Sequence, residues 1–272
     1  MRYIDLDATL QSAPRDIIDD LKVVDSSMFT LSNDEKQKKA SKGNDVWKPI
    51  KVYFEKATNR KCWYTESKNP GCLNDLEHYR PKGLVQNKDG TILHWYWFLA
   101  FNPINYRLSA HIPNRLNKNE VWGETGGKGN KFPLLKGSVH GDDLTKINSE
   151  LPVLLDPCCE SDVSLLEFLP DGRPVTSQKF SGDATAVQRV TESSLLLNLD
   201  YPTFNVDREK LYNKIRKLVT RGDRYFEERN NALDDTKQDL RDLMIKDAEY
   251  SKAAECYIRC FRDRKWVEDL LY

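Results

Sequence analysis

The stretch Asp75-Leu-Glu-His-Tyr-Arg-Pro-Lys82 places an acid directly before a histidine in the middle of the chain. An aromatic run follows from Leu93 to Phe101, and then come Asn105 and Asn114, with eight residues between them. A third segment, Lys128-Gly-Asn-Lys-Phe-Pro-Leu134, lies farther on. The three segments supply the acid, base and amide side chains from which a hydrolytic centre can be built.

Hydrolysis of a phosphodiester is the chemistry that uses all of these residue types. The bond is anionic and resists attack, so the reaction needs an activated water and a cation that stabilises charge on the phosphoryl oxygens. A histidine near its ordinary pKa can take the proton from water. A carboxylate and an amide oxygen are ligands that suit Mg²⁺, and a second amide can orient the loop that carries the histidine.

Composition limits the classes of protein that the chain can represent. The 272 residues can bury a sizeable core, and 42 basic residues balance 42 acidic ones, so nucleic acid would have to bind a local patch. The aromatic run of nine residues is short of the ~20 that cross a bilayer as a helix. The N-terminal residues are acidic where a signal peptide would be apolar, which predicts a cytoplasmic protein without membrane contact.

The six cysteines predict neither a disulfide framework nor a zinc cluster. In a chain of this length without a secretion signal they are interpreted as free thiols, and no two of them form a CxxC pair. Cys256 and Cys260 share one face of a predicted helix, and Cys158 adjoins Cys159, but both pairs are interpreted as ordinary packed or idle thiols.

Hydrophobic patterning predicts an α+β protein that is mainly helical. An N-terminal helical segment is expected over residues 1–57, and a core of loops and short strands over 58–175, where Pro, Gly and Asn are frequent. A C-terminal helical region is expected over 176–272, with mixed charge that indicates either a solvated face or a surface for a partner.

Individual helices are predicted within these regions. Ala13–Val24 is amphipathic, and the polar stretch Ser32–Asn44 is interpreted as a solvated loop or helix end. A helix over Trp47–Ala57 should bury Val52, Tyr53 and Phe54. Another helix is predicted over Asp183–Leu197, and two or more long helices are predicted over Asp207–Asn230 and Ala232–Tyr272.

The three central segments resemble those of the HNH endonucleases found in Septu-type and retron-associated anti-phage systems. The resemblance rests on the DxEHxRPK, N-x8-N and KGNxFPL patterns in this order, and covers residues ~60 to 210. It implies a ββα-metal (HNH) motif embedded in the helical protein. It also implies cleavage of nucleic acid, DNA or RNA including tRNA, by a protein that works with an ABC-type ATPase partner.

The resemblance also assigns roles to residues. His78 would be the general base, Glu77 and Asn114 the ligands of Mg²⁺ or Mn²⁺, and Asn105 the catalytic-centre residue that holds the histidine loop in place. Five basic residues are implied as contacts to nucleic-acid phosphates: Arg80, Lys82, Arg115, Lys118 and Lys128.

One departure from the family concerns zinc. Many relatives hold a structural zinc with two CxxC pairs, whereas this chain has Cys62 but Thr65, Ala110 and Pro113 at the other three positions. No structural zinc is therefore expected. Four aromatic residues, Trp63, Tyr64, Trp95 and Trp97, are close enough in sequence to replace the zinc by packing.

Simpler interpretations compete with the catalytic one. A Glu-His pair is often a surface ion pair, and asparagine is a common residue in turns and caps. His94 in the aromatic run favours a core histidine, while His111 and His140 favour loop positions. The alternative function is an adaptor that keeps the HNH fold, lacks strong catalysis and binds the ATPase partner.

Overall fold

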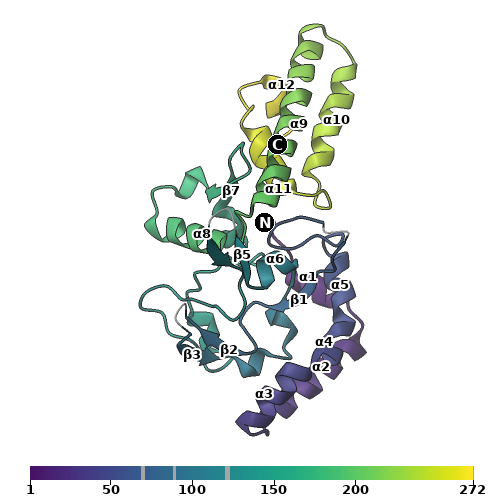
Figure 1. Cartoon of the computed structure of the whole chain (residues 1–272). Helices are drawn as coiled ribbons and strands as arrows, with labels where there is room; N and C mark the ends of the chain where they lie inside the picture. Colours follow the sequence, from purple (N-terminus) through teal and green to yellow (C-terminus); the bar gives the residue numbers. More distant parts are fainter. Residues whose placement is uncertain (69–70, 88–89, 120–122, 272) are drawn as a thin grey trace.

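The computed structural model describes residues 1–68, 71–87, 90–119 and 123–271. Helices from the two ends of the chain flank a middle part built of short antiparallel strands (Figure 1). The prediction of an α+β protein is confirmed at this level. Within the described ranges, no helix is both long and apolar enough to cross a membrane.

Two of the N-terminal helices, α1 and α3, begin at side-chain caps, which Asp5 and Ser32 provide. Ser32 and Glu35 form a capping box, so the polar stretch predicted as a loop or helix end is a helix of ten residues. Val52 is 42% exposed and does not add to the core as predicted, whereas Phe54 is fully buried. The helices of this part are α1 (Leu6–Gln11), α2 (Arg15–Met28), α3 (Asn33–Lys42), α4 (Asn44–Trp47) and α5 (Lys51–Lys56).

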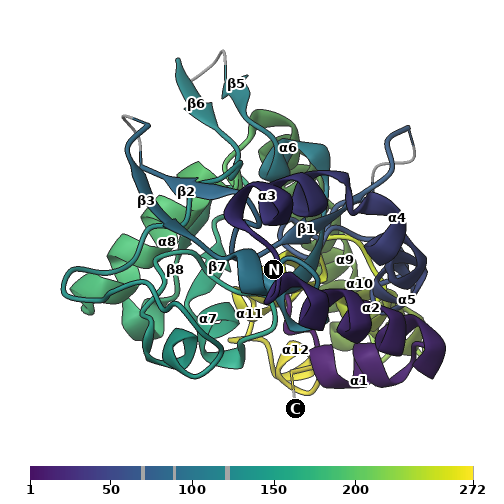
Figure 2. The same ribbon diagram turned by 90° about the horizontal axis from the view of Figure 1, so that it is seen from below.

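The described residues of the middle part form four antiparallel strand pairs. The pairs are β1 (Asp75–His78) with β4 (Tyr106–Ser109), β2 (Leu84–Gln86) with β3 (Ile92–Trp95), β5 (Asn117–Asn119) with β6 (Glu124–Gly126), and β7 (Leu166–Phe168) with β8 (Pro174–Thr176). Two short helices lie between strands, α6 (His111–Asn114) and α7 (Glu160–Ser164). The β2–β3 and β5–β6 pairs project from the same side of the molecule (Figure 2).

Helix α9 begins earlier than the sequence predicts, and the residues after it are divided among shorter helices. Helix α9 starts at Pro202, since proline fits the first position of a helix, and it runs without interruption for 26 residues. The last predicted segment is divided into three, with Tyr250 in a left-handed conformation before the second of them. The helices are α8 (Ala184–Leu196), α9 (Pro202–Glu227), α10 (Ala232–Met244), α11 (Ser251–Arg259) and α12 (Lys265–Glu268).

Two hydrophobic clusters hold the elements together. One packs the N-terminal helices, through Trp47 and Phe54, against Tyr106 and Leu108 of β4. The other joins the middle part to α8–α12 and includes Trp266 beneath α9. The β1–β4 pair thus has helices 1–57 against one of its faces, and this face carries His78.

Candidate active site

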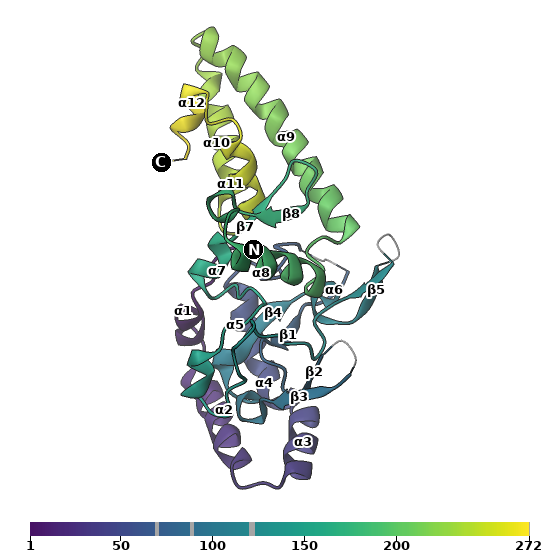
Figure 3. The same cartoon turned by 90° about the vertical axis from the view of Figure 1, so that its left-hand side faces the viewer.

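The pairing of β1 with β4 decides which side chains share a face. His78 lies opposite Tyr106, and Glu77 lies opposite Arg107. Neighbouring residues of a strand point to opposite faces of a sheet, and residues directly across a pair point to the same face. His78 therefore faces the N-terminal helices, while Glu77 faces the other side, toward α6 (Figure 3 shows β1, β4 and α6).

His78 is a buried, oriented imidazole. Its ring centroid lies 5.0 Å from those of Trp47 and Tyr106, and its Nε2 lies 2.9 Å from the carbonyl oxygen of Ala100. A carbonyl only accepts hydrogen bonds, so Nε2 carries the proton and Nδ1 is the nitrogen that can accept one. Burial lowers the pKa of His78 to about 3, which keeps the ring neutral at physiological pH.

Glu77 lies in a buried polar cluster on the other face. Its Oε2 accepts a hydrogen bond of 2.9 Å from the hydroxyl of Tyr64, and the ammonium of Lys128 contacts its Oε1. That contact lacks good hydrogen-bond geometry, which leaves Oε1 among the buried acceptors without a hydrogen-bond donor. Burial and then the charge of Glu77 raise the pKa of Tyr64 well above its usual value, so its hydroxyl remains a donor.

Asn114, at the end of α6, points to the same side but toward a different acid. Its Nδ2 donates to Oδ2 of Asp75 at 3.0 Å. The carboxylate of Asp75 also accepts hydrogen bonds from Nε and Nη2 of Arg115, both at 3.1 Å. Nε2 of His111 lies 3.3 Å from Oδ1 of the same carboxylate. Asp75 was not predicted as a site residue, although the two-residue period of a strand places it on the same face as Glu77.

Asn105 holds the chain directly after His78. Its Oδ1 accepts from the backbone N–H of Arg80, and its Nδ2 donates to the carbonyl of the same residue, both at 2.8 Å. The backbone carbonyl of Asn105 also accepts the N–H of Tyr79 at 2.8 Å. These three hydrogen bonds hold the backbone of Tyr79 and Arg80 in place directly after His78.

Replacing Asn105 should disturb this loop more than replacing its neighbour Asn102. Asn105→Ala leaves a backbone N–H and a carbonyl of Arg80 without their partners, which costs about 1–3 kcal/mol for each buried group. We expect a lower melting temperature, measured by circular dichroism. Asn102→Ala removes only a bond of 3.3 Å to the N–H of Ile104 and should melt near wild type. Equal melting temperatures of the two variants would contradict the role of Asn105 in holding the backbone of Arg80.

Three of the five side chains predicted to contact phosphates bind groups of the protein itself. Nε of Arg80 donates to Glu150 at 2.6 Å, and Nζ of Lys82 donates to the carbonyl of Ala40 at 3.1 Å. Lys128 is only 2% exposed, and its Nζ also donates to the carbonyl of His78 at 2.7 Å. In this arrangement Lys128 acts inside the protein rather than at a nucleic-acid surface.

Arg115 and Lys118 are the two predicted contacts at the surface. The Arg115 side chain is 59% exposed even with its ion pair to Asp75. Lys118 is exposed on β5, and within the described ranges it has no ion pair. Arg115, which is bound to Asp75, lies on the same side of the β1–β4 pair as Asn114.

The oxygen donors on the Glu77 face fit a divalent ion in part. A carboxylate oxygen without a hydrogen-bond donor, an amide and a second carboxylate are hard ligands of the kind that Mg²⁺ accepts while it keeps several waters. Among the described residues, no three His, Cys, Asp or Glu side chains are grouped to hold a metal. An ion at Glu77 would also compete with the ammonium of Lys128 for Oε1.

Aromatic side chains pack beside the β1–β4 pair, as predicted from the sequence for a chain without structural zinc. Trp63 stacks on Phe54 at 5.0 Å between ring centroids, and its backbone N–H donates to Leu108 of β4 at 2.9 Å. Tyr64 holds Glu77. Trp95 and Trp97 pack elsewhere, against Lys82 and Phe29. Of the four aromatic residues, Trp63 and Tyr64 are therefore the two that contact the β1–β4 pair.

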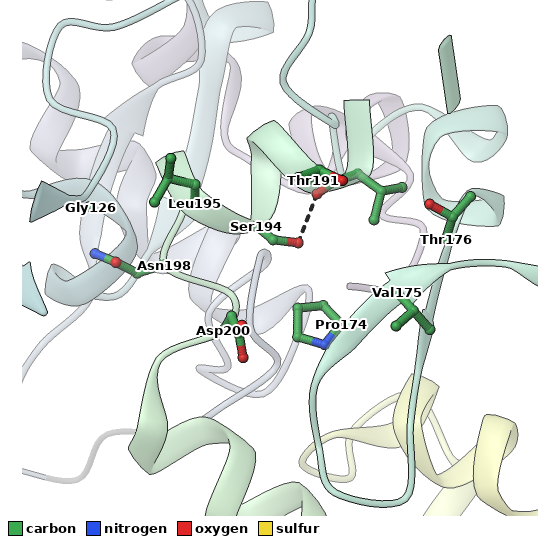
Figure 4. Close-up of a pocket in the computed structure, with 10 residues that line it drawn as sticks. Gly126, Pro174, Val175, Thr176, Thr191, Ser194, Leu195, Asn198 and Asp200 are labelled. Atoms are coloured by element: carbon green, nitrogen blue, oxygen red, sulfur yellow. Dashed lines mark hydrogen bonds between the residues drawn. The ribbon is translucent and has the colours of Figure 1, made fainter. Parts of the chain in front are cut away.

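A cavity of about 570 Å³ lies beside α6, between α8, β8 and β6 (Figure 4). Asn198 forms part of its wall and donates through Nδ2 to the carbonyl of Ile112 at 3.0 Å. A Cβ atom at Gly126 would lie 1.8 Å from Oδ1 of Asn198, so only glycine permits this close approach. Asn198 thereby fixes α6 from the side opposite to β1.

Comparison with known proteins adds no identity: no protein-family model matches the chain, and no curated protein matches it at a significant level.

Proposed function

We propose that the chain is a metal-dependent nuclease of the HNH type. The observation that carries the proposal is the orientation of His78, whose Nε2 is fixed by Ala100 and whose following loop is fixed by Asn105. An oriented, neutral imidazole that can accept a proton is what a general base for water activation needs, although Glu77, the next residue on the strand, points to the opposite face. The pairing of β1 with β4, followed by the short helix α6, supports the comparison with a ββα-metal motif, although β2 and β3 lie between the two strands in the chain.

The residues would divide the chemistry among them. Glu77 and Asn114 would hold Mg²⁺ or Mn²⁺, which supplies positive charge to the phosphoryl oxygens when bound. His78 accepts the proton of the attacking water at Nδ1 and returns it to solvent. Arg115 and Lys118, at the surface, contact phosphates of the bound strand. Asn105 positions the segment that carries the base.

The biological setting of the proposal rests on resemblance. A nuclease of this kind would be the effector of an anti-phage system and would act with an ABC-type ATPase. Mixed charge on the C-terminal helices makes them the surface that we assign to this partner.

Cleavage assays test the proposed activity. The whole chain is incubated with labelled DNA and, separately, with RNA including tRNA, in Mg²⁺, in Mn²⁺ and in excess EDTA. It is assayed alone and after co-purification with the products of its neighbouring genes. We expect cleavage that requires the metal. Cleavage that is undiminished in EDTA would contradict the proposal.

The pH dependence of cleavage has a defined sign. The pKa of His78 is lowered to about 3 from an ordinary value of 6.5, so the folded protein keeps the base neutral down to acidic pH. We expect no loss of rate that titrates near pH 6.5 in a profile of kcat/KM. A half-maximal rate near pH 6.5 that disappears in a His78 variant would show an ordinary, exposed histidine instead.

Two observations favour the second candidate, an adaptor with the same fold. A base with a pKa of about 3 is weak, and Lys128 already neutralises Glu77. Both features would also be expected if the β1–β4 pair had only a structural role. An adaptor would bind the ATPase partner equally well when His78 or Glu77 is replaced, and it would take up no divalent ion.

A further inference from the structure

A row of basic side chains runs along the solvent side of α9. The row, which we call the α9 stripe, consists of five residues at alternating spacings of four and three: Lys210, Lys214, Lys217, Arg221 and Arg224. Residues three and four apart are neighbours on one helix face, about 5–6 Å from each other. The stripe is therefore continuous over about 21 Å, at 1.5 Å per residue.

The stripe is exposed because the opposite side of α9 forms the core contact. Ile215 and Val219 are almost fully buried, and Gly222 meets the ring of Trp266. All five basic residues of the stripe are exposed, with the side chain of Lys210 at 72%. Figure 3 shows α9 as a long rod whose one side has no other element packed on it.

The charge of the stripe is only partly neutralised. Lys210 pairs with Asp207 at 3.0 Å, and Arg221 pairs with Asp239 of α10 at 2.7 Å. Within the described ranges, Lys214, Lys217 and Arg224 have no ion pair. Three uncompensated positive charges on one helix face stand out in a chain whose net charge is zero.

The chemistry of the stripe fits a polymer of regular negative charge. Exposed large apolar side chains occur before it at Val206 and beyond it at Phe226, but none lies between Lys210 and Arg224. The centre of a protein interface is usually apolar, and the stripe has no such centre, so it differs from the mixed-charge remainder of the C-terminal helices that we assign to a protein partner. A shallow groove lined by Lys210, Asn213, Lys214, Lys217, Leu218 and Arg221 follows the helix.

We propose that the α9 stripe binds the phosphodiester backbone of a nucleic acid. One strand of a duplex advances 3.4 Å per nucleotide, so the stripe would follow about six nucleotides. Binding is independent of base sequence, because the stripe offers only charge to the strand. The inference shares with the proposed nuclease only the class of ligand and does not require Glu77 or His78.

Charge reversal in the stripe tests the proposal. The whole chain is titrated into a labelled oligonucleotide in EDTA, so that no cleavage occurs, and fluorescence anisotropy is measured over a range of salt. Lys214→Glu with Lys217→Glu should weaken binding by about tenfold or more and reduce the salt slope by about 1.4–1.8, from about 0.7–0.9 per phosphate contact. Asp239→Asn, which frees Arg221, should strengthen binding.

A matched control separates the stripe from general charge. Arg216 is exposed and adjoins Lys217, but it lies about 120° around α9 from the stripe. Arg216→Glu should bind nearly as wild type. Three results would overturn the proposal. They are a loss of oligonucleotide binding in Arg216→Glu as large as that in the double variant, unchanged oligonucleotide binding in the double variant, and binding of a polyglutamate peptide as strong as that of the oligonucleotide. Retained binding without any cleavage would reject the proposed nuclease and leave the stripe intact.

Discussion

His78→Ala is expected to reduce metal-dependent cleavage by roughly 10²–10⁴-fold, the range that positioned general bases contribute. Alanine has no atom that can accept a proton from water, and no second imidazole lies on this face of the β1–β4 pair in the described part of the chain. Cleavage is measured under single-turnover conditions with Mn²⁺, because binding and product release then do not mask the chemical step.

The variant must be shown to fold, since His78 is buried. Its loss removes one of two donors to the carbonyl of Ala100, which keeps the hydroxyl of Tyr106 at 3.1 Å, so thermal unfolding is followed alongside cleavage. His94→Ala is the matched control, because this half-buried imidazole stacks on His140, outside the hairpin. A folded His78→Ala protein that cleaves like wild type would reject His78 as the base.

Glu66→Gln should destabilise the protein by about 3–5 kcal/mol, the usual effect of removing one partner of a buried ion pair. The carboxylate of Glu66 lies 2.9 Å from the amine of Met1 and 3.7 Å from Nζ of Lys61, and it accepts from the hydroxyl of Ser251 at 2.8 Å. It joins the N-terminus, the segment before β1 and α11, so its loss affects all three. Unfolding in urea measures the change.

Acid should have the same effect as this substitution. Burial would raise the pKa of Glu66, but the Met1 amine and Lys61 outweigh it and lower the pKa to about 2 from 4.5. The stabilisation is therefore complete above pH 4.5 and is lost as the pH falls toward 2. Asp19→Asn, which removes an exposed pair with Lys22, should change stability by less than about 1 kcal/mol. Similar losses in both variants would contradict the ion-pair account.

The sequence predicted the helices well where the signals are local. Periodic apolar residues located α2 and α8, and only the ends moved. Errors arose where a cap or a proline decided the boundary. The Ser32–Glu35 capping box made α3 a helix, and Pro202 started α9 five residues before the predicted Asp207.

The candidate site was predicted less completely, because its contacts join distant segments. Asn105 lies beside Arg80 and bonds its backbone, while the role that the resemblance implies for it stays a prediction. The pairing of Lys128 with Glu77 crosses 51 residues, and no local pattern indicates that this lysine is buried. Asp75 was not predicted as a site residue, although it shares a strand face with Glu77, because the prediction rested on the adjacent residues Glu77 and His78.

Binding of Mn²⁺ tests the central claim most directly, because it reports on the Glu77 face without requiring an activated enzyme or a partner. Free Mn²⁺ is counted by electron paramagnetic resonance as it is titrated into the wild-type chain and into Glu77→Gln, each with an uncleavable oligonucleotide. The account predicts one ion bound per wild-type chain and a large loss of affinity in Glu77→Gln. No stoichiometric binding by the wild-type chain, or equal binding by both proteins, would contradict it.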